Sequence, residues 1–164
     1  MAEYEHIKHT FEPVYNQASE ILILGSFPSV KSREQGFYYG HPYNRFWKVL
    51  ANIFECDVPE TIEEKKQMLL SNHVAIWDVI AECDIIGSSD SSIKNVTPAD
   101  INSLLAVSNI KYIYANGKTA EKLYRKYALP LTDRDVIVLP STSPANAAYS
   151  LEKLTSVWRT SLNI

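Results

Sequence analysis

A loop rich in aromatic residues, GFYYGHPYNRFW at positions 36–47, contains the side chains best suited to binding a flat ligand. Loops lie at the surface, so large rings within one require a specific role. A nucleobase needs a ring to stack on, and Tyr39, Tyr38 or Phe37 could supply it, at about 1–3 kcal/mol per stacked base. The last two aromatic residues of the segment fall within a helical pattern and are expected in the core.

Asn44 and His41 are the polar residues of this loop with chemical potential. Asn44 directly precedes the helical pattern, so it can cap the helix, which contributes about 1 kcal/mol. Its amide could instead hold a water molecule for attack, and both roles are compatible if its oxygen points into a cleft. The residue type by itself favours the cap. For His41, a role within the loop is favoured over a role as a ligand or an acid.

Polar residues also follow other apolar segments. Asp78 ends one such segment, where it could accept hydrogen bonds from a base, activate water, or simply begin a turn. The loop STSPAN at 141–146 offers hydroxyls and amides, which bind phosphate oxygens readily, although a Ser/Pro loop is also a common turn. The loop GSFPS at 25–29 allows close approach of the backbone to a ligand, but an ordinary connection is the favoured alternative.

The positions of these loops follow from the hydrophobic pattern of the chain. Short continuous apolar runs predict strands over 20–25, 73–79, 110–116 and 135–140. Helical spacing predicts helices over 44–54, 60–71, 97–107, 118–128 and 151–160. Thr97 is expected to cap the third of these helices, with Pro98 in its first turn, and a polar loop is expected between the second strand and this helix.

Alternation of apolar strands with helices predicts an α/β fold, a parallel sheet covered by helices on both faces. Ligands of such sheets bind outside the carboxyl ends of the strands. Four loops leave those ends, after Gly25, Trp77, Ala115 and Pro140. The polar residues described above should therefore meet at one edge of the sheet.

The formal net charge of −3 and the isoelectric point of about 5.8 argue against a protein that coats nucleic acid without specificity. Two segments are nonetheless basic, and each is equally compatible with a phosphate-binding face and with a solvated helix face. Their cations are Lys31, Arg33, Arg45 and Lys48 in the first, and Lys111, Lys118, Lys122, Arg125 and Lys126 in the second.

The 164 residues are expected to form a single domain over 1–164, since domains typically have roughly 100–150 residues. Cys56 and Cys83 lack metal-ligand spacing, which indicates a reduced protein inside the cell. The segment MAEYEHIKHT lacks the apolar stretch of a signal peptide. No apolar run approaches the ~20 residues that span a bilayer. We therefore expect a monomer with no membrane partner, cytoplasmic or, in a bacterium, nucleoid-associated.

Together these segments resemble the uracil-DNA glycosylase superfamily, in particular its mismatch-specific uracil/thymine branch and the related hypoxanthine-DNA glycosylases. The resemblance rests on HPYNRFWKVL at 41–50, on GSFPS paired with LPSTSPAN at 139–146, and on SLEKL at 150–154. It extends from the first strand to the final helix. It implies a three-layer α/β/α sandwich with a central, mainly parallel four-stranded sheet, in agreement with the hydrophobic pattern.

The resemblance also implies a reaction. A damaged base is flipped out of the duplex, at a cost of a few kcal/mol in lost stacking. Its glycosidic bond then breaks through an oxocarbenium-like sugar, and water adds to C1′. No lysine in these segments is placed to form a Schiff base, so a monofunctional hydrolase without lyase activity is expected. The resemblance implies neither a metal nor another cofactor.

Site residues are implied position by position. Phe27 stands where most of the superfamily has the Asp or Asn that holds water, a departure that the hypoxanthine branch shares. In that branch the asparagine of the HPxN segment is thought to take over, so Asn44 is the expected catalytic residue. Tyr39 matches the stacking aromatic residue. Asp78 stands where uracil enzymes read the base edge with Asn, and as an acceptor it would suit the N1–H of hypoxanthine. Expected DNA contacts are Ser26, Ser29, His41, Lys118, Ser141, Ser143 and Asn146.

The expected substrate is hypoxanthine in DNA. Phe27 and Ser141 occupy the positions at which uracil enzymes carry the side chains that help uracil to leave as an anion, and neither residue can replace them. A purine can instead be protonated at N7 before it leaves. The alternatives are a uracil or G:U/T mismatch glycosylase, a non-catalytic domain that binds damaged DNA or a nucleobase, and a small-molecule-binding domain unrelated to DNA. Segment 145–148 could enter the gap that a flipped base leaves.

Overall fold

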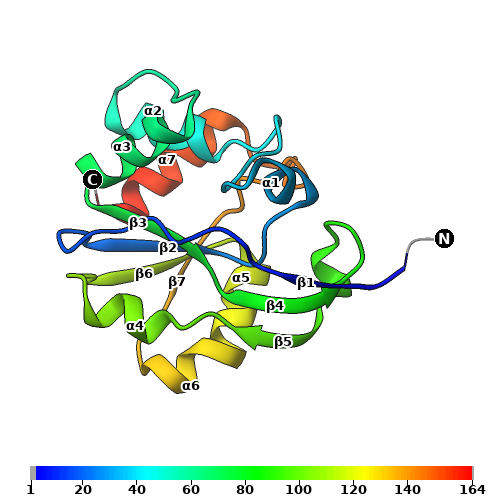
Figure 1. The fold of residues 1–164 in the computed structure, drawn as a ribbon. Helices are drawn as coiled ribbons and strands as arrows, with labels where there is room; N and C mark the ends of the chain where they lie inside the picture. The colour runs from blue at the N-terminus through cyan, green and yellow to red at the C-terminus, as the bar shows by residue number, and fades with distance from the viewer. Residues whose placement is uncertain (1–2, 164) are drawn as a thin grey trace.

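A parallel four-stranded sheet forms the centre of the computed structural model, which describes residues 3–163 (Figure 1). Its strand order is β3-β2-β6-β7, and every neighbouring pair is parallel. The strands are β2 (Ile21–Gly25), β3 (Val74–Asp78), β6 (Tyr112–Asn116) and β7 (Ile137–Leu139). These are the four predicted strands, and Gly25 lies opposite Asp78, so the carboxyl ends of β2 and the edge strand β3 meet.

Helices cover both faces of this sheet, which confirms the predicted three-layer sandwich (Figure 1). One face packs against α2 (Phe46–Phe54), α3 (Ile62–Ser71) and α7 (Leu151–Leu162). The other packs against α4 (Ile101–Ala106), α5 (Lys118–Leu123) and the π-helical turn η2 (Tyr124–Ala128), which leads into α6 (Leu129–Thr132). Successive strand residues point to opposite faces, so Ile23 enters one core while Leu22 and Leu24 enter the other.

A second sheet, which the sequence did not predict, extends from one end of the first. It is antiparallel in the order β1-β4-β5, with β1 (Glu5–Lys8), β4 (Ile80–Ile85) and β5 (Lys94–Pro98). The polar loop predicted after the second strand therefore begins only after β4, and it contains a short turn η1 (Asp90–Ser92). These strands are short and rich in charged residues, so they lack the apolar run that marks a buried strand.

Two helix starts also differ from the prediction. Thr97 lies in β5 and caps no helix; the cap of α4 is Asp100, whose side chain accepts the Ser103 N–H at 3.3 Å. The GSFPS loop leads into an unpredicted helix, α1 (Val30–Gln35), which Ser29 caps. Asp and Ser are preferred caps because their side-chain oxygens satisfy free helical N–H groups.

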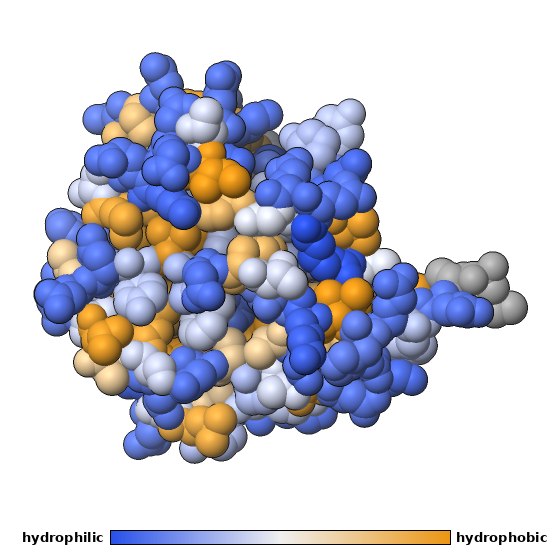
Figure 2. Space-filling model, in the orientation of Figure 1, coloured by the Kyte–Doolittle hydropathy of each residue, from blue (hydrophilic) through white to orange (hydrophobic). Residues whose placement is uncertain are grey.

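Among the helices formed by residues 3–163, none combines the length and hydrophobicity needed to cross a bilayer. On the face shown in Figure 2, hydrophobic residues form small groups among hydrophilic ones.

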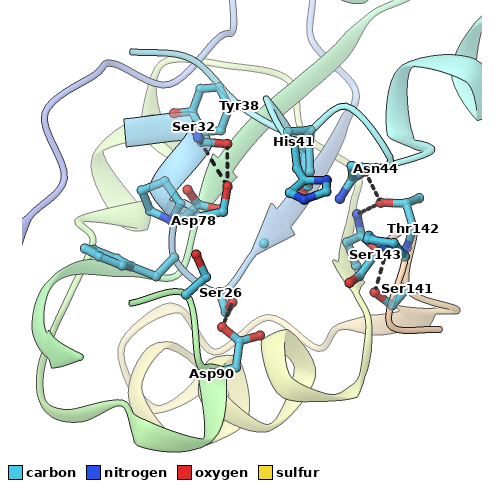
Figure 3. A pocket seen from close by; sticks show the side chains of 18 residues that line it. Ser26, Ser32, Tyr38, His41, Asn44, Asp78, Asp90, Ser141, Thr142 and Ser143 are labelled. Atoms are coloured by element: carbon cyan, nitrogen blue, oxygen red, sulfur yellow. Dashed lines mark hydrogen bonds between the residues drawn. The ribbon is translucent and has the colours of Figure 1, made fainter. Parts of the chain in front are cut away.

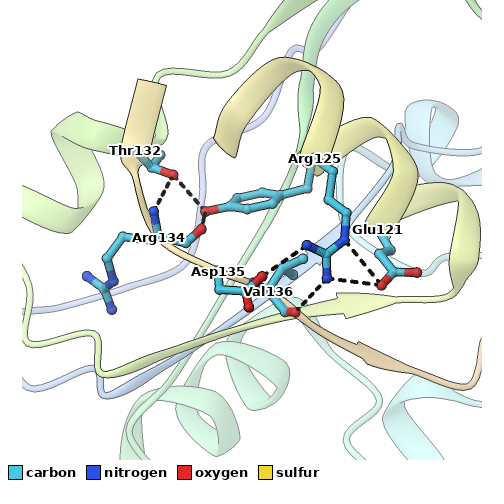
Figure 4. Close-up of polar contacts among 7 residues, drawn as sticks. Glu121, Arg125, Thr132, Arg134, Asp135 and Val136 are labelled. Atoms are coloured by element: carbon cyan, nitrogen blue, oxygen red, sulfur yellow. Dashed lines mark hydrogen bonds and ion pairs between the residues drawn. The ribbon is translucent and has the colours of Figure 1, made fainter. Parts of the chain in front are cut away.

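The basic cluster predicted over 111–126 is partly neutralised. Arg125 bonds to Glu121 and Asp135 (Figure 4), and elsewhere Lys111 bonds to Glu20. Arg125 also donates to the Val136 carbonyl, which ties η2 to the strand region. Lys111 and Arg125 are therefore engaged in surface ion pairs, whereas the other three lysines of the segment form no ion pair within residues 3–163.

Candidate active site

A cavity of about 240 Å³ opens at the carboxyl ends of the parallel strands, where the sequence predicted a site (Figure 3). Its walls come from the ends of β2, β3 and β6, and from the loops 26–29, 38–44 and 141–144. Ser88 and Asp90 close it on the side of the second sheet. The cavity is smaller than the roughly 300–1,000 Å³ of drug-sized ligand sites, so it suits a compact group such as one base.

Asn44 lines this cavity and also satisfies the start of a helix. Its Oδ1 accepts the N–H of Phe46, the first residue of α2, at 2.9 Å. The same oxygen accepts the hydroxyl of Thr142 at 2.8 Å. The two roles considered for Asn44 are therefore compatible in position, although its oxygen is engaged by the protein on both sides.

The wall of the cavity at β3 is formed by Asp78, which is held by a partner from the N-terminal segment. His9 Nε2 lies 2.8 Å from Asp78 Oδ2, and both side chains are only 5% exposed. The other oxygen, Oδ1, faces Gly25: a Cβ at that position would lie 2.5 Å from it. Only glycine leaves room for this carboxylate, which remains available as an acceptor toward the cavity.

Tyr39 also lines the cavity, with its ring stacked on Phe46 at 3.9 Å between centroids and an angle of 18°. Its hydroxyl is the one buried side-chain polar atom among residues 3–163 that lacks a hydrogen-bond partner. Burial raises the pKa of this phenol, so it remains protonated and can donate. A buried unsatisfied group costs about 1–3 kcal/mol, so a partner that reached this hydroxyl would be favoured.

The other aromatic candidates belong to the core. Phe37 and Tyr38 are 5% and 2% exposed, and the Tyr38 hydroxyl donates to the Glu12 carbonyl at 2.9 Å. Phe27 is 8% exposed; it lines the cavity but packs into the core beside α4 and α5. Of the rings considered for stacking, Tyr39 is thus the least buried one at the cavity.

Arg45 fixes the shape of the loop after β7. Its backbone N–H and Nε both donate to the Thr142 carbonyl, and its guanidinium also donates to the carbonyls of Ser143, Asn146 and Tyr149. Arg45 belongs to the first basic segment, but its guanidinium bonds to carbonyls of this loop and does not extend a positively charged surface. This one side chain therefore bonds to four carbonyls of the loop and helps to hold it against the start of α2.

The predicted DNA contacts divide into two groups by position. Ser26, Ser29, His41, Ser141 and Ser143 line the cavity, whereas Lys118 and Asn146 do not. Lys118 begins α5 next to the end of β6. Asn146 uses its side-chain amide within the loop, where it donates to the Ser141 carbonyl at 3.0 Å.

Several of these side chains also have structural partners. Ser29 caps α1, and the hydroxyls of Ser141 and Ser143 accept backbone N–H groups of their own loop. Ser26 donates to Asp90 Oδ1 at 3.1 Å. Asp90 belongs to an exposed turn, but loss of water on its cavity side raises the pKa of its carboxyl.

Several residues of the site are not indicated by the sequence patterns, among them His9, Asp90, Asn116 and Thr142. Asn116 ends β6, so its position at a strand end was a usable signal. Thr142 is fully buried within the STSPAN loop, and its residue type does not distinguish it from the neighbouring serines. His9 and Asp90 carry no such signal, because the second sheet that places them was not predicted.

Comparison with known proteins gives a consistent result. A family model described as the uracil DNA glycosylase superfamily matches residues 12–161. A protein named hypoxanthine DNA glycosylase from Methanosarcina acetivorans is 35% identical, covering 88% of this chain and 91% of the relative. A protein of the same name from Methanosarcina barkeri is 32% identical, with 92% and 95% covered.

The fold comparison agrees. A solution NMR structure from Methanosarcina acetivorans, described as a candidate uracil DNA glycosylase, matches with a TM-score of 0.76 and 32% identity. The match covers 92% of this chain and 95% of that one.

Proposed function

The chain belongs to the uracil-DNA glycosylase superfamily, and we propose that it releases hypoxanthine from DNA by hydrolysing the glycosidic bond of a flipped deoxyinosine. We further propose that it does so as a single domain and a monomer, inside the cell. The relatives named hypoxanthine DNA glycosylase support this substrate, and so does the chemistry of the cavity.

The observation that carries the proposal is the pair of polar groups beside Gly25. Asp78 Oδ1 and the Tyr39 hydroxyl are the two side-chain groups nearest to the position of a Cβ there, at 2.5 and 3.1 Å. The first is an acceptor and the second a buried donor without a partner. Hypoxanthine carries the complementary pair on one edge, N1–H beside O6.

Adenine carries the opposite pattern on that edge, an acceptor at N1 and an amino group at C6. A carboxylate facing N1 of adenine would meet a lone pair, so adenine is disfavoured. Guanine and thymine also place an N–H beside a carbonyl, so this pair of groups does not by itself distinguish them from hypoxanthine. A site built to satisfy a hydrogen-bonding edge rejects a base that leaves its polar groups unpaired. Uracil also places an N–H beside a carbonyl, so it must be tested beside hypoxanthine.

The remaining residues take the following roles in the proposal. Asn44 contacts the attacking water, Phe27 and Tyr39 shape the cavity, and Asp78 reads the base. Ser26, Ser29, His41, Lys118, Ser141, Ser143 and Asn146 contact the DNA around the flipped nucleotide. After N7 is protonated, the C1′–N9 bond breaks with its electrons going to the base. Water then adds to C1′ and loses a proton, which leaves an abasic site.

The test is single-turnover base release from a duplex with one deoxyinosine, with deoxyuridine and undamaged duplexes in parallel and alkali to cleave abasic sites. Wild type should cut deoxyinosine, and Asn44→Ala should cut it only at a low residual rate. Asn102→Ala is the matched control, since this exposed asparagine bonds to the Leu131 carbonyl outside the cavity. If only deoxyuridine is cut, the substrate proposal is wrong. If neither is cut, the proposed hydrolysis is wrong and a role in binding damaged DNA becomes the leading alternative.

Tyr39→Phe tests the base-reading pair, because it removes only the unpartnered hydroxyl. The rate on deoxyinosine should fall by about fivefold, as expected for one hydrogen bond of about 1 kcal/mol. Tyr112→Phe serves as the control on an exposed tyrosine at the start of β6. An unchanged rate for Tyr39→Phe would remove the hydroxyl from the recognition of the base.

A further inference from the structure

Thr142 connects two asparagines across the cavity wall (Figure 3). Its side chain is fully buried, and its hydroxyl lies 2.8 Å from Asn44 Oδ1 and 3.0 Å from Asn116 Nδ2. Its backbone N–H also donates to Asn116 Oδ1 at 3.1 Å. The three residues come from three different segments, so this arrangement exists only in the folded protein.

The direction of each hydrogen bond follows from the groups at its ends. A hydroxyl has one hydrogen to donate. Asn116 must present its NH₂ to the Thr142 hydroxyl, because its oxygen is taken by the Thr142 N–H. The hydroxyl accepts that bond and directs its own hydrogen to Asn44. The chain of donation thus runs from Asn116 through Thr142 to Asn44.

Asn44 in turn has only one favourable orientation of its amide. Both the Phe46 N–H and the Thr142 hydroxyl donate to its oxygen. If the amide were rotated by 180°, so that Oδ1 and Nδ2 exchanged places, its NH₂ would face these two donors and could not accept from them. The oxygen is therefore held by the protein, and the NH₂ group is the part of Asn44 that remains for the cavity.

We propose that Thr142 is a positioning residue that, together with Asn116, holds Asn44 as a hydrogen-bond donor toward the attacking water. In this arrangement Asn44 binds the oxygen of the water and does not take up its proton. This suits an oxocarbenium-like sugar, which is electrophilic enough to be attacked by neutral water. The predicted effect on the reaction rate rests on the proposed function. The orientation of the Asn44 amide rests only on the hydrogen bonds.

The experiment compares Thr142→Val, Thr142→Ser and the control Thr155→Val under single-turnover conditions on the deoxyinosine duplex. Valine keeps the shape and removes the hydroxyl. The rate should fall by about tenfold or more, the scale expected when a catalytic group loses its position. DNA affinity measured by fluorescence anisotropy should be unchanged, serine should restore the rate, and Thr155→Val should behave as wild type. Thr155 is also buried, but its hydroxyl donates to the Leu151 carbonyl within α7 and accepts from Asn52 of α2, and neither partner lines the cavity.

Coupling to Asn44 separates positioning from a general loss of structure. In an Asn44→Ala background, Thr142→Val should have no further effect on the rate. Asn116→Asp gives a second route if valine prevents folding, because the new carboxylate accepts from Thr142 and draws its hydrogen away from Asn44. A wild-type rate for Thr142→Val, or an equal further loss in the Asn44→Ala background, would overturn the inference.

The side-chain amide signals of Asn44 in ¹⁵N NMR spectra test the orientation without any substrate. They should be resolved in the wild type and shift or broaden in Thr142→Val. If the wild type fails to cut deoxyinosine, the proposed function fails while this measurement still decides the inference. Unchanged Asn44 signals in Thr142→Val would refute the positioning role by themselves.

Discussion

His9 and Asp78 form a buried hydrogen-bonded pair, with Nε2 and Oδ2 2.8 Å apart and both side chains 5% exposed. They are far apart in the sequence, yet the pair joins the segment after β1 to the carboxyl end of β3. One oxygen of the carboxylate is thus held by the protein, while the other faces the cavity beside Gly25. The N-terminal segment is therefore part of the active-site architecture.

His9→Phe should destabilise the protein and slow base release. The new ring keeps the contacts with Phe11 and Tyr38 but leaves Asp78 Oδ2 without its donor. Leaving a buried acceptor unsatisfied should lower the free energy of unfolding by about 1–3 kcal/mol. Denaturant unfolding measures this loss. A double-mutant cycle with Asp78→Asn should show coupling, and strictly additive effects would contradict a direct interaction.

Gly25→Ala should reduce activity through the position of Asp78. The added Cβ would lie 2.5 Å from Asp78 Oδ1, so the carboxylate or the strand must move. We expect a loss of rate on deoxyinosine of about tenfold or more, since displacement of a contact group by about 1 Å can cost this much. Single-turnover assays measure it.

Gly36→Ala is the matched control for that substitution. Gly36 ends α1 with φ of 71° and has no atom within 4 Å of an added Cβ. It should lose about 1 kcal/mol of stability from left-handed strain and keep its rate. A Gly25→Ala enzyme as active as Gly36→Ala would show that the cavity tolerates the movement.

Arg45→Lys should loosen the loop after β7. The planar guanidinium reaches the carbonyls of Thr142, Ser143, Asn146 and Tyr149, whereas an ammonium cannot match that set. Faster amide hydrogen exchange in residues 142–149 and a stability loss of about 2 kcal/mol are expected. Arg159→Lys, which alters one exposed bond to the Asn52 carbonyl, should change neither quantity. Unchanged exchange in Arg45→Lys would show that the loop holds without this arginine.

His6 should make stability depend on pH near neutrality. Its hydrogen bond to Asp84 raises the pKa of the imidazole above 6.5 in the folded protein. A raised folded pKa favours the folded state fully below the unfolded pKa, and this stabilisation is lost as the pH rises through the folded pKa. The Tm of wild type should therefore exceed that of His6→Gln at about pH 5.5, and the difference should shrink toward about pH 8.5. A difference independent of pH would contradict a contribution from the charged imidazole.

The sequence by itself determined the central sheet, the helices around it and the edge at which the site lies. Buried strands such as β2 and amphipathic helices such as α2 are recognisable because hydrophobic periodicity is a local property of the chain. The strand-end rule then placed Asp78 at the cavity, and the HPYN segment indicated Asn44. The branch of the superfamily was also recognisable from short segments.

Only the tertiary structure decided how these residues are held. The second sheet brings in His9 and Asp90, and its short, charged strands lack a local signal. The choice of Tyr39 over Phe37 and Tyr38 depends on which ring the fold buries. The orientation of the Asn44 amide depends on Thr142, which is distant in sequence. A hydrogen-bond partner is chosen by three-dimensional proximity and by the burial of competing groups, and neither is encoded in the spacing of residues along the chain.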